Sequence, residues 1–207
     1  PYLAGWIYAL GIAWDAVTDP FMGYLAERTS TPRGRYRPYI FFGTIPLALS
    51  FVLLFWVPPL EGLSLFLCLV VINVFHRTCF TIVSVPYSSL TPRITSDSEE
   101  RTKLTTARMI GASFGTLLMS SLGFPIINFF GQNNESLGII YLSFIAASIA
   151  VVILFITYGS VKESSTEEIK EAYPSVSKLI LSILKNYPFW IVFSSILILG
   201  STTIMFN

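Results

Sequence analysis

The stretch that decides the fold is SLGIIYLSFIAASIAVVILFITYG, residues 136–159. Its 24 residues include no acidic or basic side chain. As an α-helix the stretch would extend about 36 Å, at ~1.5 Å per residue, and the hydrocarbon core of a bilayer is about 30 Å thick. A segment this long and apolar is typical of a helix that crosses a membrane, so we expect an integral membrane protein.

The rest of the chain has the same character. Of its 207 residues, 53% are hydrophobic and 12% are charged, whereas a soluble domain carries about 25% charged residues. The basic residues are scattered between apolar runs and form no patch for a polyanion, which excludes a nucleic-acid partner. We predict an all-α, polytopic membrane helix bundle with six transmembrane spans, at residues 1–25, 38–58, 63–90, 104–130, 136–159 and 188–206.

The segments between the spans predict the orientation of the chain. Lysine and arginine follow the first, third and fifth spans, whereas the intervening turns PPLEGLS and GQNNES contain neither. Because basic loops stay in the cytoplasm, we expect these three loops on the cytoplasmic side of a multi-pass protein of the cell membrane. Residues 163–186 are charged and then amphipathic, which predicts a connecting helix at the cytoplasmic membrane surface. Since the chain begins inside an apolar span, we expect a fragment of a longer protein.

Two carboxylates interrupt the first span in WDAVTDPFMG, residues 14–23. A charge at mid-bilayer costs about 2.5–3.5 kcal/mol on insertion scales, so Asp15 and Asp19 must face protein or water. They lie on one helical face, and Thr18 adds a hydroxyl oxygen beside them. Three hard oxygen ligands suit a small cation such as Na⁺. Two adjacent carboxylates also resist being ionised together, so the pair could hold a proton instead. The alternative is a structural carboxylate pair satisfied by a neighbouring helix or by the basic loop.

The third span contains a matching polar stripe in FHRTCFTIVSVPYSSL, residues 75–90. Arg77, Thr81, Ser84 and Ser88 follow one another at helical spacing and therefore share one face. At ~1.5 Å per residue, Thr81 and Ser84 lie at about the same depth as the two aspartates of the first span. Polar walls from two helices near the midplane predict a hydrophilic cavity, the usual place of solute and ion sites in transporters.

The charge on Arg77 needs a partner inside the membrane. The candidates are Asp15, Asp19 or an acidic substrate, which a guanidinium grips with two hydrogen bonds. A purely structural ion pair is the alternative. We interpret His76, which points to another side of the same helix, as a hydrogen-bonded core residue, with a role in proton relay as the other possibility.

Four motifs along the chain resemble, in the right order, those of the glycoside-pentoside-hexuronide:cation symporters, the melibiose-permease-like branch of the major facilitator superfamily. They are DAVTDPFMG, GRYRPY, TIVSVPYSSL and SEERTKLTTAR, and the resemblance covers residues 1 to 115 or so. It implies that the six spans are helices II to VII of a twelve-helix transporter. Residues 1–160 would then be an N-terminal bundle without its first helix, 161–187 a cytoplasmic linker, and 188–207 the first helix of a C-terminal bundle.

The resemblance also implies a cation site. Asp15, Thr18, Asp19 and Thr81 match positions that in melibiose permease bind the coupling Na⁺, Li⁺ or H⁺, although the position of Thr18 is an asparagine there. In a sodium-coupled protein, Asp15 and Asp19 would be the metal ligands. This assignment agrees with the cation site that the residues themselves suggest.

A substrate site is implied by Ser84, Ser88 and Arg108, which match an aspartate, a tryptophan and an arginine of the family's sugar site. The serines depart from the pattern, and loss of the carboxylate removes a strong acceptor for sugar hydroxyls. Arg77 adds a cation nearby, so we expect a substrate other than melibiose, including an anionic glycoside. Arg108 lies near the membrane interface and could instead be a snorkelling residue.

We therefore expect a cation-coupled secondary transporter of a sugar or glycoside, not an enzyme, with Na⁺ or H⁺ as coupling ion and no other cofactor. Its partners are the small-molecule substrate, the lipid bilayer and the missing remainder of the transporter. The alternatives are a transporter of a non-sugar solute on the same fold, a channel or an inert membrane scaffold. An intramembrane aspartyl protease is disfavoured, because its two aspartates must flank one water from different helices.

Overall fold

The computed structural model describes residues 2–95, 97–132, 134–161, 185–188, 190–191 and 194–195. Within these ranges all regular secondary structure is helical, which confirms the predicted all-α class. The chain divides into two units, residues 1–165 and 166–207, and the five long helices belong to the first unit. These helices are α1 (Tyr2–Arg28), α2 (Arg37–Leu54), α3 (Gly62–Ile94), α4 (Ser98–Gly131) and α5 (Glu135–Ser160).

Four of these helices, α2 to α5, are long and apolar enough to cross a membrane. Helix α1 has 27 residues, which is sufficient length, but Asp15 and Asp19 lower its hydropathy. Each of the first five predicted spans coincides with one helix. The sixth predicted span and the predicted surface helix at 163–186 lie largely outside the described residues, and the proposed division at residues 160 and 187 stays a prediction.

Side-chain caps decide where α4 and α5 begin. Asp97 precedes α4 and its carboxylate accepts a hydrogen bond from the backbone N–H of Glu99 at 2.8 Å. The acidic residues Glu99 and Glu100 in the first turn favour the positive end of the helix dipole. For this reason α4 begins before the apolar segment that the sequence identified. Asn134 caps α5 in the same way, through a hydrogen bond from Leu137 N–H at 3.3 Å.

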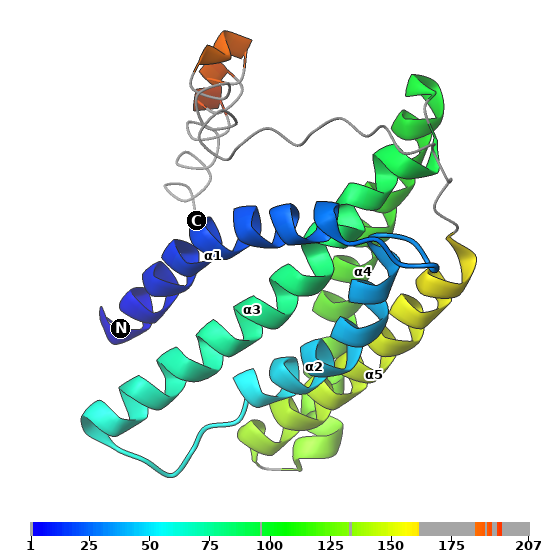
Figure 1. Ribbon diagram of the computed structural model, residues 1–207. Coiled ribbons are helices and arrows are strands. Elements are labelled where there is room, and N and C mark those ends of the chain that lie inside the picture. The colour runs from blue at the N-terminus through cyan, green and yellow to red at the C-terminus, as the bar shows by residue number, and fades with distance from the viewer. Residues whose placement is uncertain are drawn as a thin grey trace. The chain divides into compact units, whose positions relative to one another are not determined.

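Helix α3 occupies the middle of the arrangement, between α1 and α2 (Figure 1). Helix α2 packs on α5, α5 packs on α4, and α4 also touches α3. The connections between successive helices are short, which favours opposite directions for neighbours in sequence. Helices α1 and α3, which are two apart in sequence, therefore run parallel and side by side.

A small buried cluster holds three of the helices together at one end. Met22 and Ala26 of α1 pack with Ile40 of α2 and Leu90 of α3, joined by Tyr36 from the preceding loop. Many other large apolar side chains are exposed on the helix faces, as expected of helices that hydrocarbon surrounds. The buried cluster fixes the position of α1 along α3, and hence the residues that face each other farther along the two helices.

Candidate functional site

One stripe of α1 faces α3. It consists of Gly11, Asp15, Asp19, Met22 and Ala26, which follow one another at intervals of three or four residues and so lie on one side of the helix. The apolar members, Met22 and Ala26, belong to the buried cluster at the end of the bundle. The polar members lie in the middle of the helix, where they meet polar side chains of α3.

Asp19 meets Thr81 across this interface. The Thr81 hydroxyl donates a hydrogen bond to Oδ1 of Asp19 at 2.7 Å, and the Thr81 side chain is buried. A hydroxyl is a neutral donor, so the full negative charge of the carboxylate remains, and the second carboxylate oxygen can still accept a proton or coordinate a cation. This pair joins two of the four residues predicted for the cation site.

Asp15 meets Arg77. The guanidinium and the carboxylate form an ion pair through Arg77 Nη1 and Asp15 Oδ2, and both side chains are half-buried. Among the three partners considered for Arg77, the structure thus shows Asp15. Both cross-interface pairs, Asp15 with Arg77 and Asp19 with Thr81, are separated by 62 residues. This constant separation is the register of two parallel helices, and it follows from the packing of α1 on α3.

Further contacts at this interface were not expected from the sequence. The Nε of Arg77 donates to Oδ1 of Asn73 at 3.3 Å, and the guanidinium carbon lies 5.5 Å from the ring centroid of Tyr8. The indole N–H of Trp14 donates to the Thr78 hydroxyl at 2.9 Å. Asn73 lies one helical turn before Arg77, so its position in the stripe was a signal that could have identified it.

Thr18 does not bond directly to either aspartate. Its hydroxyl donates to the backbone carbonyl of Trp14 at 3.1 Å, which is a common local bond of threonine in a helix. The oxygen keeps its lone pairs for another partner. Its predicted role as a cation ligand therefore stays a prediction.

The residues predicted for the substrate site lie farther along α3 and on α4. Arg108 of α4 is exposed, and its guanidinium carbon lies 5.5 Å from the ring centroid of Tyr87 on α3. Ser84 is half-buried and lies one turn before Tyr87, and Ser88 is exposed and directly follows it. The structure thus places Arg108 against the segment of α3 that carries the two serines. The hydrophilic cavity expected between the stripes stays a prediction.

His76 lies on the opposite side of α3 from α1, toward α2 and α5. Its Nδ1 lies 3.1 Å from the hydroxyl of Ser50, which is fully buried. The imidazole also borders a cavity of about 360 Å³ lined mainly by apolar residues of α2, α3 and α5. The hydrogen bond expected for His76 is confirmed, and its alternative role in proton relay stays a prediction.

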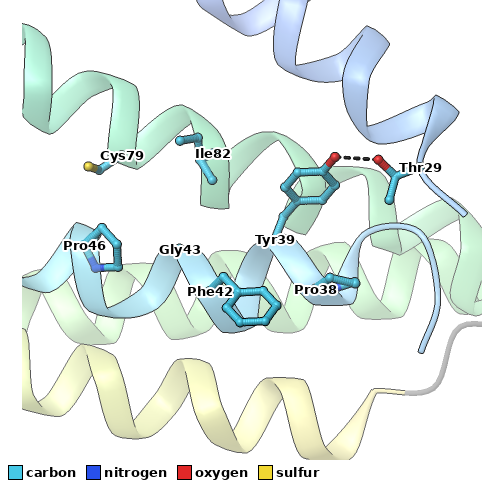
Figure 2. A pocket seen from close by; sticks show the side chains of 8 residues that line it. All are labelled: Thr29, Pro38, Tyr39, Phe42, Gly43, Pro46, Cys79 and Ile82. Carbon is cyan, nitrogen blue, oxygen red and sulfur yellow. Dashed lines mark hydrogen bonds between the residues drawn. The ribbon is translucent and has the colours of Figure 1, made fainter. Parts of the chain in front are cut away.

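A second cavity, of about 340 Å³, lies between α2 and α3 (Figure 2). Its walls include Pro38, Phe42, Pro46 and Ile82, and its polar groups include the Thr29 and Tyr39 hydroxyls, which are 2.5 Å apart. Because the two hydroxyls hydrogen-bond to each other, this cavity presents few polar groups that could bind a polar solute. The polar interface of α1 and α3 is the better candidate for the functional site.

In membrane helices, carboxylates, an arginine and hydroxyls that contact one another mark substrate or ion pathways, which indicates the class of polytopic transport proteins. Comparison with known proteins identifies the family within that class. The family described as MFS/sugar transport protein matches residues 1–207. The chain therefore belongs to this branch of the major facilitator superfamily, that of the glycoside-pentoside-hexuronide:cation symporters, as the four motifs predicted.

Several curated proteins are similar to this chain. A putative glycoside/cation symporter of Escherichia coli, YagG, is 30% identical over 184 residues, which are 89% of this chain and 40% of that protein. The isoprimeverose transporter of Lactiplantibacillus pentosus is 29% identical over 92% of this chain and 40% of its own length. The sodium-dependent lysophosphatidylcholine symporter 1-A of Danio rerio is 39% identical over 61% of this chain and 24% of its own. The chain thus spans about two-fifths of the length of the first two relatives.

Proposed function

We propose that this sequence is part of a twelve-helix secondary transporter that couples uptake of a sugar or glycoside to a Na⁺ or H⁺ gradient. The observation that carries the proposal is the α1–α3 interface, where Asp15 pairs with Arg77 and Asp19 accepts a hydrogen bond from Thr81. Relatives named as a glycoside/cation symporter and an isoprimeverose transporter support the substrate class. The basic loops after the first, third and fifth spans support a cytoplasmic location for those loops.

The cation would bind between α1 and α3, at Asp15, Thr18, Asp19 and Thr81. Binding of a positive charge compensates a carboxylate that is otherwise costly inside the membrane. If the same event orders the neighbouring substrate pocket, the cation and the substrate raise each other's affinity by the same factor. Rocking of this bundle against the rest of the transporter would then expose the site to each side in turn.

The substrate would contact Ser84, Ser88 and Arg108, which follow the cation site along α3 and on α4. Hydroxyl and guanidinium groups are suitable partners for sugar hydroxyls and for a uronate carboxylate. Arg77 would join them only if its guanidinium left Asp15, so an acidic substrate and Asp15 would compete for it. This competition makes a neutral glycoside the simpler substrate for the arrangement observed.

A second candidate is a lipid-like solute carried on the same fold. It is favoured by the relatives named sodium-dependent lysophosphatidylcholine symporters, one of which is 39% identical over 130 residues. The two candidates differ in what they require of the polar stripe on α3, because a lipid needs a long apolar surface and a sugar needs hydrogen-bond partners. Competition between labelled glycoside and lysophospholipid for uptake separates them.

The test is uptake of labelled glycosides by membrane vesicles that contain the complete transporter. We expect accumulation above the outside concentration only when a Na⁺ or H⁺ gradient is imposed, and loss of that accumulation in Asp19→Asn. Asp97→Asn is the matched control, because asparagine also caps a helix and Asp97 lies outside the polar interface. Flux that ignores both gradients would support a channel and contradict the proposal.

A further inference from the structure

Three charged groups meet near the middle of α1 and α3 in the described part of the chain. Asp15 and Asp19 contribute one negative charge each, and Arg77 contributes one positive charge. Their sum, −2 + 1, is −1. The arginine does not sit between the two acids as an equal partner of both. Its ion pair is with Asp15, whereas the partner shown for Asp19 is the neutral hydroxyl of Thr81.

Arg77 is held in this position from several sides. Asn73 accepts a hydrogen bond from its Nε at 3.3 Å, and the ring of Tyr8 lies 5.5 Å from its guanidinium carbon. Gly11 lies directly beneath the arginine side chain. A Cβ atom added at Gly11 would be 2.6 Å from Asn73 Oδ1 and 2.8 Å from Arg77 Cδ, which is closer than real Cβ contacts. The missing side chain at this position makes room for the arginine.

We propose that Arg77 is a built-in counter-charge that occupies Asp15 and leaves a single negative charge, on Asp19, for one monovalent cation. Asn73 and Gly11 are the residues that position it. The proposal rests on the function proposed above and makes its cation site specific. Among the predicted cation-site residues, it assigns Asp19 and Thr81 to the cation and makes Asp15 an aspartate that stabilises the site through Arg77.

The physical reason is the cost of net charge inside a membrane. A guanidinium stays protonated at any physiological pH, so the charge of Asp15 is always compensated. Asp19 has no such compensation from Thr81, and an isolated charge in hydrocarbon is unfavourable. One Na⁺ or one proton brings the total to zero. A divalent cation would leave an excess charge of +1, so the site should select monovalent cations and bind one per transport cycle.

Charge arithmetic gives the test, which uses cation-dependent uptake by the complete transporter in vesicles. In Asp15→Asn the total becomes 0, because the charge of Asp15 is removed. Arg77 is then free to compensate Asp19, and we expect the cation concentration for half-maximal uptake to rise on the order of 10-fold or more. In the double variant Asp15→Asn, Arg77→Gln the total returns to −1. We expect this second substitution to recover most of the lost cation dependence.

The double variant decides between the two roles of Asp15. If it remains as impaired as Asp15→Asn while its thermal unfolding midpoint in detergent matches that of the unaltered protein, Asp15 binds the cation directly and the proposal is wrong. The proposed function fails by a different result, namely cation-driven uptake that survives in Asp19→Asn. Should the double variant not fold, Arg77→Lys provides the second measurement. In Arg77→Lys the three groups keep their total charge of −1, so uptake should still depend on a single cation. A tenfold or larger rise in the cation concentration for half-maximal uptake would overturn the counter-charge role.

Gly11→Ala tests how Arg77 is positioned, with Gly5→Ala as the matched control. Gly5 lies on the same helix, and a Cβ there has no neighbour within 4 Å. Alanine at position 11 should displace Arg77 from Asp15 and shift the cation concentration for half-maximal uptake, whereas alanine at position 5 should not. Equal behaviour of the two variants would show that Gly11 does not set the position of the arginine.

Discussion

The interface between α1 and α3 and the interface between α4 and α5 each join two long helices, but they do so with different kinds of residue. Helices α1 and α3 meet through Asp15, Arg77, Asp19 and Thr81. Helices α4 and α5 meet through glycines, where a Cβ added at Gly138 would lie 2.9 Å from Cγ2 of Ile127. Small residues let helix backbones approach closely in lipid, and they do so without charge.

This difference distinguishes an interface that only packs two helices, α4 with α5, from one that we propose also binds a cation, α1 with α3. The α4–α5 contact shows that the chain can join membrane helices with uncharged residues. Close packing of two membrane helices therefore does not in itself require charged groups, and their presence between α1 and α3 calls for another explanation.

The largest effect should come from Thr81→Val, which keeps the shape of the side chain and removes the hydroxyl that bonds to Asp19. Valine also removes one of the oxygen ligands proposed for the cation, so the cation concentration for half-maximal uptake should rise about 10-fold or more. Thr78→Val is the control, because Thr78 bonds to Trp14 and not to an aspartate. A larger effect at Thr78 than at Thr81 would contradict the assignment of the cation site.

At the other interface, Gly138→Leu should affect stability without changing cation dependence. The added side chain overlaps Ile127, and overpacking costs about 1–3 kcal/mol, which should lower the thermal unfolding midpoint in detergent. Gly159→Leu is the control on the same helix, since a Cβ there has no neighbour within 4 Å. If Gly138→Leu changes cation dependence by more than its loss of stability explains, the α4–α5 interface also contributes to cation binding, and the two interfaces do not differ in function.

Ser50→Ala examines a polar contact that we place outside the cation site. It removes the hydroxyl that lies 3.1 Å from His76 Nδ1, and we expect a loss of stability of roughly 1 kcal/mol with unchanged uptake. Ser148→Ala is the control, because Ser148 is exposed and bonds to its own helix backbone. If uptake by Ser50→Ala loses its dependence on the proton gradient, His76 belongs to a proton path and our interpretation of it is wrong.

The smallest effect is expected at the ion pair of Lys103 with Glu99. The two charges are 2.8 Å apart, one helical turn from each other, and their side chains are exposed by 71% and 76%. Because water screens such pairs, Lys103→Ala should change stability by less than about 0.5 kcal/mol and leave uptake unaltered. Comparison with Arg77 variants would show how strongly the surroundings of an ion pair determine its contribution.

The helices themselves were predictable from the sequence. Apolar segments of sufficient length place α1 to α5 because a membrane requires helices that satisfy their own backbone hydrogen bonds. The ends were less predictable. α4 begins at Ser98 because of the cap at Asp97, which is a polar signal that hydropathy overlooks. The six-span count goes beyond the residues described here, and its last member stays a prediction.

The candidate site was predictable in its residues and less so in its pairs. Helical periodicity placed Asp15 and Asp19 on one stripe and Arg77 and Thr81 on another. It left open which acid meets Arg77, since that depends on how far α1 is shifted along α3. The shift comes from packing at a distance, at residues such as Met22 and Leu90. Gly11 was overlooked for the same reason. Its importance comes from the side chains of α3 that pack against it, Asn73 and Arg77.

Helix α1 carries a consequence for how the protein is made. It is the one long helix in the described ranges that lacks the apolarity of an independent span. The groups that contact its aspartates, Arg77 and Thr81, are synthesised 62 residues after them. During translation, we therefore expect α1 to remain in the insertion machinery or at the membrane surface until α3 emerges. Biogenesis of the bundle should then depend on this pairing, so we expect a mutation on α3 to impair insertion of the earlier helix.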